Sequence, residues 1–281
     1  MLPFRKSGCE IDMVEIKPKI EYPFPWSGKS FFNVMPESVL CIQSEIEEPT
    51  FKRKNYDLVV IAYQPWFLSP SIPASSILQY DSFKSILRNT PVVTLIGARN
   101  MWISAQEKIK KFLKTAEANL VGNIVLTDKN PNLISAITIQ YWMFTGKKGK
   151  FLGIFPTPGV SEKDINFTHV FGTEVVNHLN QNNLSHLQHS LIKKSALSVN
   201  HVLMFVESRA IKIFNIWANV IVSKQNRTAW LLLFKYYLII ALFFLSPMVI
   251  LIYLLLIYPF NSASIKNRLS YYQSVNYEPQ R

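Results

Sequence analysis

The C-terminal part of the chain contains an apolar run that constrains the fold more than any other feature. Residues 236–260, YYLIIALFFLSPMVILIYLLLIYPF, form 25 consecutive positions without a charged side chain. At about 1.5 Å of rise per residue, a helix of this length crosses a hydrocarbon core of about 30 Å with some tilt. We therefore expect a membrane helix over about 230–260, preceded by a much more polar part of the chain.

The geometry of that helix has two alternatives. Pro247 lies near its middle, and a proline inside a helix removes a hydrogen bond and favours a kink. The halves on either side, 231–245 and 248–260, are each too short to span a bilayer alone. A re-entrant hairpin is therefore the alternative to a single span.

The chain is basic, and half of its net charge of +12 lies after residue 200. Residues 201–281 hold eight Lys or Arg and two acidic residues, Glu207 and Glu278, which gives a net charge of +6. Such an excess suits either nucleic acid or anionic lipid. Because the basic residues flank apolar runs and no nucleic-acid-binding motif is present, the pattern favours lipid over nucleic acid. The Lys and Arg residues around the run indicate an N-terminal domain on the cytoplasmic side of the cytoplasmic membrane.

The first 165 residues alternate between strand and helix patterns. Continuous β-branched apolar runs predict buried strands, and amphipathic segments predict the helices between them. The predicted strands are 56–63, 91–97 and 119–128, with a half-buried strand over 9–16, and the predicted helices are 75–88 and 103–116. This alternation is typical of an α/β domain with a doubly wound parallel sheet. Ser104 and Glu107 have the spacing of a capping box at the start of the second helix.

In a doubly wound sheet, ligands bind where loops leave the carboxyl ends of the strands. Trp66 and Phe67 lie in the loop that follows the strand 56–63. Flat aromatic side chains at a strand end suit stacking on a planar ring, such as the isoalloxazine of a flavin. The alternative is a proline-rich turn with packed aromatic side chains.

The loop after the strand 91–97 holds the second group of candidates, which are Gly97, Arg99, Asn100 and Trp102. Backbone N–H groups of a turn that leads into a helix can donate to the polar edge of a cofactor. Arg99 has the charge to stabilise an anionic ring or a carboxylate, so it is the catalytic candidate. The alternative is a surface arginine beside a core tryptophan. No histidine and cysteine pattern has metal-ligand spacing, so we expect no metal site.

Several blocks of the chain together resemble one family, the dialkylresorcinol condensing enzymes. The blocks are YDLVVIAYQPWFLSPSIP, PVVTLIGARNMWISAQEKIKKFL, LVGNIVLTD, WMFTGKKGKFLGIFPTPGVS and the tail LFKYYLIIALFFLSPMVILIYLLLIYPF. The resemblance covers nearly all of the chain, and QPWFLSPSIP and WMFTGKK are its most specific parts.

The resemblance implies a flavodoxin-like three-layer sandwich, an FMN cofactor and a role in making dialkylresorcinols and aryl-polyene pigments. It implies a lipid-like β-keto acyl or cyclohexenone substrate, with a separate ketosynthase and an acyl carrier protein as partners. Because the chain has no thiolase-like nucleophile, oxidative aromatisation by a flavin fits it better than carbon–carbon bond formation. The carried-over pocket positions are Trp66, Phe67, Arg99, Asn100 and Trp102.

One departure from the family pattern concerns the cofactor. In a flavodoxin-like domain, a Ser/Thr-rich loop after the first strand holds the FMN phosphate. The chain as given begins with MLPFR, which resembles the end of the first helix. We therefore expect the first strand, normally central in the sheet, and the phosphate loop to be missing, either because the sequence is truncated at its N-terminus or because the pocket has decayed. Such a gap would leave backbone groups of the sheet unpaired.

The sequence thus predicts four parts. These are an α/β domain over 1–165, a connector over 166–229 with an amphipathic, interfacial helix, a membrane helix over 230–260 and a basic polar tail over 261–281. The expected function is that of a membrane-associated flavin oxidoreductase or aromatase in dialkylresorcinol biosynthesis. The alternatives are a non-catalytic membrane scaffold with a relic pocket and an NAD(P)H:quinone-type flavin reductase.

Overall fold

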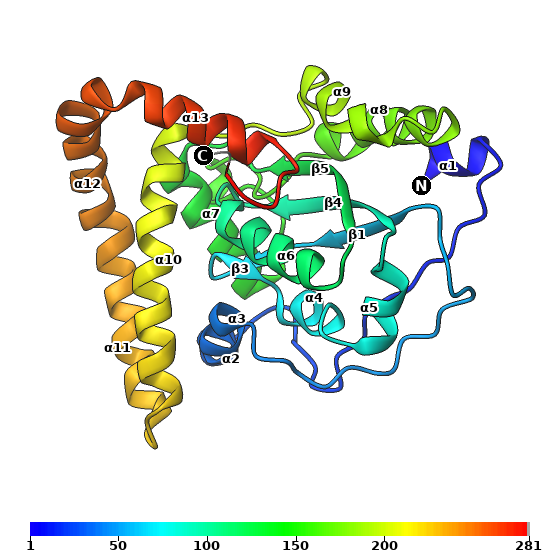
Figure 1. The fold of residues 1–281 in the computed structure, drawn as a ribbon. Coiled ribbons are helices and arrows are strands. Elements are labelled where there is room, and N and C mark those ends of the chain that lie inside the picture. The colour runs from blue at the N-terminus through cyan, green and yellow to red at the C-terminus, as the bar shows by residue number, and fades with distance from the viewer. Residues whose placement is uncertain (280–281) are drawn as a thin grey trace.

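The structure, a computed structural model, describes residues 1–279 and is built around a parallel sheet (Figure 1). The sheet has the strand order β1–β4–β5, with β1 (Val59–Tyr63), β4 (Pro91–Ala98) and β5 (Asn119–Thr127). Each strand coincides with a predicted one, because β-branched apolar side chains suit a strand that is covered on both faces. The predicted α/β class with a parallel sheet is therefore confirmed.

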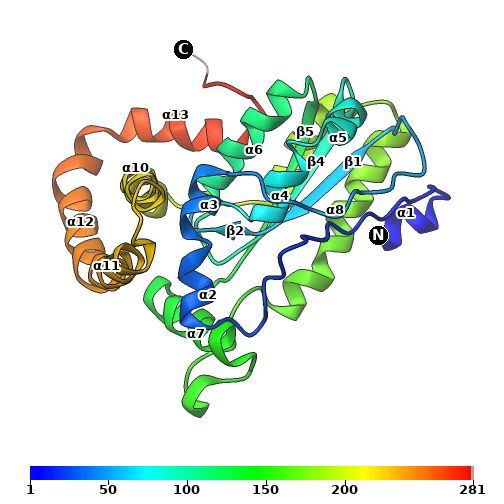
Figure 2. The same ribbon diagram turned by 90° about the horizontal axis from the view of Figure 1, so that it is seen from below.

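Helices cover both faces of this sheet (Figures 1 and 2). One face carries α4 (Ile72–Ile77), α5 (Asp81–Leu87) and α6 (Ile103–Thr115), and the other carries α8 (Glu162–Asn180) and α9 (Leu187–Lys193), with α1 (Leu2–Lys6) against α8. The sequence-based boundary at residue 165 separates α8 and α9 from the sheet that they cover. In the structure they belong to one packed unit, residues 1–200, which we call the α/β body.

Shorter elements connect and flank these layers. They are α2 (Gly28–Asn33), α3 (Met35–Leu40), β2 (Pro65–Trp66), β3 (Ser69–Pro70), α7 (Asn132–Thr145), η1 (Phe151–Gly153) and η2 (Leu184–His186). Strands β2 and β3 form a small antiparallel hairpin directly after β1.

Two local predictions in the α/β body are wrong. The segment 9–16 forms no strand, because its polar groups bond to loop residues rather than to a neighbouring strand. The Asp12 carboxylate accepts hydrogen bonds from the Lys52 backbone N–H (2.9 Å) and from the Tyr56 hydroxyl (2.5 Å). The single helix predicted over 75–88 is two helices, α4 and α5, separated by a turn at 78–80.

The strand pairing shows where the edges of the sheet lie. β1 pairs with β4 and β4 pairs with β5, so no position is open between these three strands. Within residues 1–279, β1 pairs on one side only, and its Val60 side chain is 47% exposed. β5 is the other edge strand, and its outer N–H groups bond to Ala196, Gln188 and Tyr277, so the open backbone edge lies beside β1.

A helical hairpin follows the α/β body (Figure 1). Its inner helix is α10 (His201–Val222), and its outer helix runs through α11 (Arg227–Ile240), η3 (Ala241–Leu245), α12 (Ser246–Ile252), η4 (Tyr253–Ile257) and η5 (Tyr258–Phe260). The outer helix spans 34 residues and is long and apolar enough to cross a membrane. A π-helical turn, η3, precedes Pro247 and accommodates its missing N–H, so the proline does not end the helix.

The segment after the hairpin folds back onto the α/β body as α13 (Ser262–Gln273). The Tyr271 hydroxyl donates to the Glu107 carboxylate (2.7 Å), and the Gln188 side chain donates to the Gln273 carbonyl (2.7 Å). The Tyr277 hydroxyl accepts from the Leu120 backbone N–H of β5 (3.1 Å). Residues 261–279, expected to form a polar tail, are thus bonded to α6, α9 and the sheet.

A separate apolar core attaches the hairpin to the α/β body. It joins α3, α10 and α11 through buried side chains, namely Met35, Val39, Phe214, Ala218, Ile221, Leu231 and Phe234. Phe234 is 0% exposed. Its ring lies 5.3 Å from that of Phe214 and 6.2 Å from that of Phe67, so it contacts both parts.

Candidate functional site

The predicted aromatic loop after β1 is a packed hairpin. The Trp66 ring lies edge-on to the rings of Tyr22 and Trp26, at 5.1 and 5.4 Å between centroids. Phe67 and Leu68 form the two-residue turn between β2 and β3, and both have positive φ, +47° and +60°. This backbone costs bulky side chains about 1–2 kcal/mol each. It is held here because both side chains pack into the core that attaches the hairpin.

The polar candidates after β4 bond to the first residue of α7. Arg99 donates through Nη1 to the carbonyl (2.9 Å) and the side-chain oxygen (2.8 Å) of Asn132. Asn100 donates through Nδ2 to the same side-chain oxygen (2.6 Å). Burial lowers the pKa of Arg99 to about 10, although the charge of Asp128 opposes that shift, so the guanidinium stays cationic at neutral pH. These two side chains tie the β4 loop to α7.

The remaining two candidates differ in their surroundings. Trp102 is 2% exposed and belongs to the core under α6. Gly97 is exposed, and no atom lies within 4 Å of the position that a Cβ would take. None of the six predicted residues lines either of the two pockets described below.

An FMN site built from these residues does not fit the structure. An isoalloxazine needs an aromatic face to stack on and polar groups that point at its edge. The rings of Trp66, Phe67 and Trp102 pack against this chain's own side chains. Asn132 accepts from Arg99 Nη1 and from Asn100 Nδ2, and the buried Asn100 Oδ1 has no partner among the described residues.

We expect the full chain in detergent to show no saturable binding of FMN. A titration followed by flavin fluorescence should give the same emission as free FMN up to concentrations far above that of the protein. The matched control is Trp66→Ala, which should be indistinguishable from the unmodified chain. Stoichiometric quenching that is lost in the Trp66→Ala variant would contradict this expectation and restore the flavin site.

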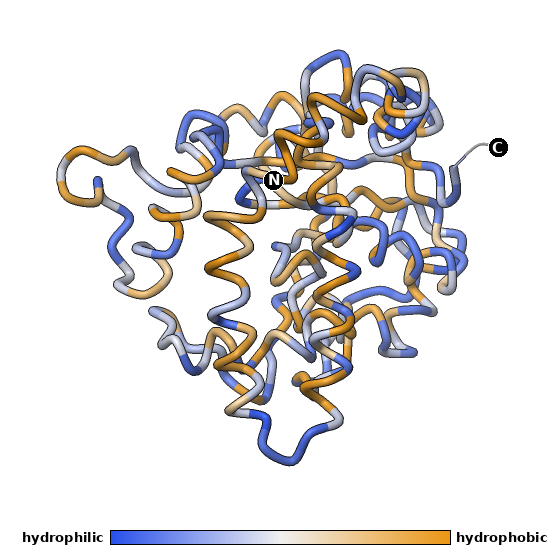
Figure 3. Tube along the Cα trace, turned by 90° about the vertical axis from the view of Figure 1, so that its left-hand side faces the viewer, coloured by the Kyte–Doolittle hydropathy of each residue, from blue (hydrophilic) through white to orange (hydrophobic). Residues whose placement is uncertain are grey.

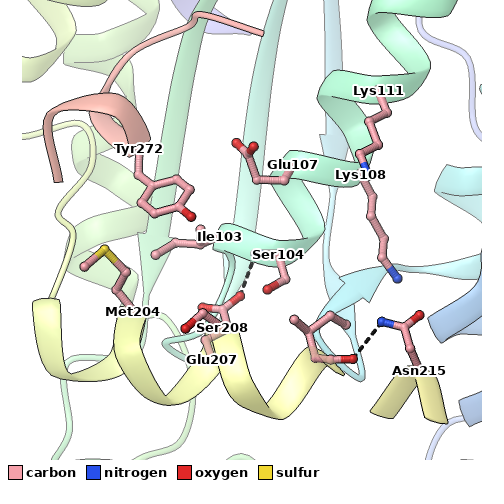
Figure 4. A pocket seen from close by; sticks show the side chains of 11 residues that line it. Ile103, Ser104, Glu107, Lys108, Lys111, Met204, Glu207, Ser208, Asn215 and Tyr272 are labelled. Carbon is pink, nitrogen blue, oxygen red and sulfur yellow. Dashed lines mark hydrogen bonds between the residues drawn. The ribbon is translucent and has the colours of Figure 1, made fainter. Parts of the chain in front are cut away.

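A different site lies where the α/β body meets the hairpin (Figure 4). A pocket of about 280 Å³ opens between α6, α10 and α13. Its lining combines apolar and titratable side chains, among them Ile103, Glu107, Lys108, Lys111, Met204, Glu207 and Tyr272. The pocket therefore offers an apolar wall beside both acidic and basic groups.

Glu207 is the most unusual residue of this pocket. It is 1% exposed, and its Oε1 accepts a hydrogen bond from the Ser104 backbone N–H at 2.6 Å. Burial raises the pKa of Glu207 to about 7, while hydrogen bonds from Ser104 and from the backbone of Ile103 and Trp102 oppose that shift. A carboxylate at a helix N-terminus accepts from N–H groups that lack partners within the helix. Both protonation states of Glu207 are therefore populated near neutral pH.

The capping box predicted for Ser104 and Glu107 is wrong. The start of α6 has no side-chain cap from its own residues, and Glu207, 103 positions away in the chain, takes that place. Glu107 instead forms an ion pair with Lys110 at 3.0 Å and accepts from Tyr271. The cap thus joins α6 to α10 rather than stabilising α6 alone.

Two lysines connect this pocket to an adjoining one of about 350 Å³. Lys108 donates to the Ser69 hydroxyl (2.8 Å) and to the Val39 carbonyl, and burial lowers its pKa. Lys111 is exposed and lines both pockets. Cys41 lines the second pocket, and burial raises the pKa of its thiol, which disfavours a thiolate nucleophile.

The sequence sets Glu207 apart, although Glu207 belongs to no recognised motif. Glu207 follows Met204-Phe205-Val206 and is the sole acid of the otherwise apolar and basic helix α10. An isolated carboxylate in such a segment is costly to bury unless it has hydrogen-bond partners. What the sequence does not reveal is the partner, because the N-terminus of α6 lies about a hundred residues earlier.

The arrangement suits proton transfer next to an apolar surface. A general acid or base is most effective when its pKa lies near the working pH, which holds for Glu207. Lys108 and Lys111 place positive charge at the same pocket, where it can balance an anionic group. Within residues 1–279, no group of three or more His, Cys, Asp or Glu side chains is arranged to hold a metal ion.

Comparison of the chain with models of known protein families, with curated proteins and with solved structures found no match.

Proposed function

We propose that this protein is a membrane-associated enzyme of dialkylresorcinol-type biosynthesis that shifts protons on a lipid-like cyclic ketone. The substrate would be a cyclohexenone or related β-keto compound that carries alkyl chains and is made by a separate ketosynthase and acyl carrier protein. The observation that carries this proposal is Glu207, a buried carboxyl group with a pKa of about 7 in a pocket beside an apolar helix.

The position of the pocket supports an amphiphilic substrate. It opens between the α/β body and α10, and the outer helix lies on the other side of α10. Ile103, Met204 and Ile211 supply apolar lining next to the charged groups. Alkyl chains could thus extend along apolar surface while the ring oxygens face Lys108 and Lys111.

The proposed chemistry is a balanced proton shift. The Glu207 carboxylate takes a proton from a carbon next to the ring carbonyl, and the electron pair moves to the oxygen as an enolate. The lysines of the pocket balance the charge on that oxygen, and Glu207 then returns the proton to it. For a cyclohexenedione, which is already at the oxidation level of a resorcinol, this shift gives the aromatic product without an oxidant, whereas a cyclohexenone with a single ring carbonyl is only enolised.

A non-catalytic scaffold is the second candidate, and one observation favours it. Trp66, Phe67 and Arg99, the residues expected to form the flavin pocket, hold loops and helices together. A scaffold would need those contacts to present a surface to a ketosynthase, and it would not need Glu207 as an acid or base.

Hydrogen–deuterium exchange on a dialkyl cyclohexenone separates the two candidates. We expect the full chain in lipid vesicles to accelerate exchange at the ring carbons next to the carbonyl, measured by mass spectrometry. Glu207→Gln should slow this exchange by about 10²–10⁴-fold, since it removes the proton acceptor. The control Glu21→Gln changes an exposed carboxylate outside the pocket and should leave the rate unchanged. Equal rates in all three proteins, or no acceleration over vesicles alone, would contradict proton transfer and favour the scaffold.

A further inference from the structure

The outer helix lies beside the α/β body rather than beyond it (Figures 1 and 2). α10 lies between the two and contacts the body near both of its ends. Near its start, Glu207 bonds to α6, and near its end Ala218 packs into the core with α3. At the tip of the hairpin, Arg227 forms an ion pair with Glu37 of α3 at 2.5 Å. The body therefore flanks the hairpin over most of its length.

This packing conflicts with a helix that crosses the bilayer. A helix of 34 residues is about 51 Å long, and it exceeds the hydrocarbon core of about 30 Å. If it crossed steeply, the elements fixed beside it, α3 and α6, would enter the hydrocarbon at the same depth. Those elements carry charged side chains and adjoin irregular loops, whose backbone groups have no partners in lipid.

The outer helix exposes apolar side chains to the surroundings over most of its girth, including Leu233, Ile252 and Leu256 at 50–65%, and one row of them is continuous. Seven side chains spaced three or four residues apart are each 50–66% exposed, namely Leu232, Tyr236, Ile240, Phe244, Met248, Leu251 and Leu255. This spacing places them on a single side of a helix. The opposite side holds Phe234 and Tyr253, which are buried against the rest of the protein. Figure 3 shows this apolar helix along the side of the molecule, with a hydrophilic loop at the hairpin tip.

Positive charge brackets that face. Lys224 at the hairpin tip and Lys266 after the outer helix are exposed, and Lys235 lies between them, whereas Arg227 is paired with Glu37. The two acids of residues 201–281 do not offset this charge at the surface. Glu207 is buried, and Glu278 is paired with Lys114. An apolar stripe with basic residues at both ends matches the surface of a bilayer that contains anionic lipid.

We propose that the outer helix lies in the plane of one membrane leaflet, with the apolar face in the lipid and the α/β body on a single side of the membrane. The pocket at Glu207 then lies one helix away from the lipid surface. This position of the helix does not depend on the chemistry proposed for Glu207. It is tested by the accessibility of cysteines and the depth of labels in the membrane, not by enzymatic activity.

Labelling of single cysteines in the full chain tests this arrangement. In a background with Cys9→Ser and Cys41→Ser, one cysteine is placed before the outer helix (Ser223→Cys), one after it (Ser264→Cys) and one on the α/β body (Ser82→Cys). All three positions are exposed. In sealed membrane vesicles, a membrane-impermeant maleimide should label the three variants to the same extent. Protection of Ser264→Cys where Ser223→Cys is labelled, or the reverse, would show a crossing helix and overturn the proposal.

Depth measurements complete the test. A fluorescent label at Leu232→Cys, Phe244→Cys or Leu255→Cys should be quenched by lipid-borne quenchers at one shallow, common depth. A crossing helix would place Phe244→Cys far deeper than the other two. Binding to vesicles should weaken at least tenfold when Lys224, Lys235 and Lys266 are replaced by Gln or when anionic lipid is left out. Cross-linking of two chains through Phe244→Cys without quenching by lipid would assign the face to a second copy and would equally overturn the proposal.

Discussion

The stability of the protein is expected to fall as the pH rises from about 4.5 to about 7, and Glu207→Gln is expected to abolish that decrease. The pKa of Glu207 is about 7 in the folded chain, against 4.5 for an unperturbed glutamate. The folded state therefore binds this proton more tightly than the unfolded state does. Between these two pKa values the unfolding free energy decreases with pH, by roughly 3 kcal/mol in total, and then stays level.

Chemical unfolding of the detergent-purified chain at a series of pH values measures this effect. The amide that Glu207→Gln introduces carries no charge and keeps an oxygen that can accept from Ser104, so the stability of the variant should be nearly flat over the same window. Above pH 7 the variant should therefore be the more stable protein. The exposed Glu21→Gln variant should follow the unmodified chain. If the unfolding free energy of Glu207→Gln decreased with pH as steeply as that of the unmodified chain, other titrating groups would be responsible for the decrease.

Phe234→Ala is expected to cause the largest loss of stability among single substitutions in the hairpin. The ring is fully buried between α3, α10 and the turn that holds Phe67. Its removal costs about 3–5 kcal/mol, because apolar contact is lost and a cavity remains. Since these contacts join the hairpin to the α/β body, we expect the substitution to expose α3 and α10 to hydrogen exchange while the sheet stays protected.

Phe244→Ala provides a matched control on the same helix. Phe244 is 66% exposed and lies on the opposite side, so its replacement should change the unfolding free energy in detergent by less than about 0.5 kcal/mol. Equal losses in the two variants would contradict the packing of Phe234. If α3 and α10 stayed protected from hydrogen exchange in Phe234→Ala, the hairpin would be attached mainly by other contacts.

The sheet and its helices were predictable because they depend on local patterns. The strands β1, β4 and β5 are continuous β-branched runs, and α6 has one apolar side and one basic side. The segment 9–16 has an equally regular alternation, yet it forms no strand. An alternation of apolar and polar residues indicates that one side of a segment is buried. That side can be buried against loops as well as within a sheet. A strand also needs a neighbour with a free edge, and sequence spacing alone does not reveal one.

The candidate site was harder to predict because its parts come from distant segments. The sequence correctly placed Arg99, Asn100 and Trp102 in the loop between β4 and α6, but it did not show that Arg99 and Asn100 each donate to Asn132. Glu207 lies in a helix that the sequence assigned to a membrane-proximal connector. Its role depends on the start of α6, and only the folded chain brings these two segments together.

The turn at Phe67 and Leu68 shows how a poor local sequence can serve a distant part of the molecule. A two-residue turn of this kind is normally made by Asn-Gly, which adopts positive φ at little cost. Here two large side chains occupy the turn and pack against the helical hairpin. The strained backbone of the turn is therefore held by contacts that also attach the hairpin. Asn-Gly at this point would relieve the backbone strain, but it would also remove the apolar contacts between the turn and the hairpin.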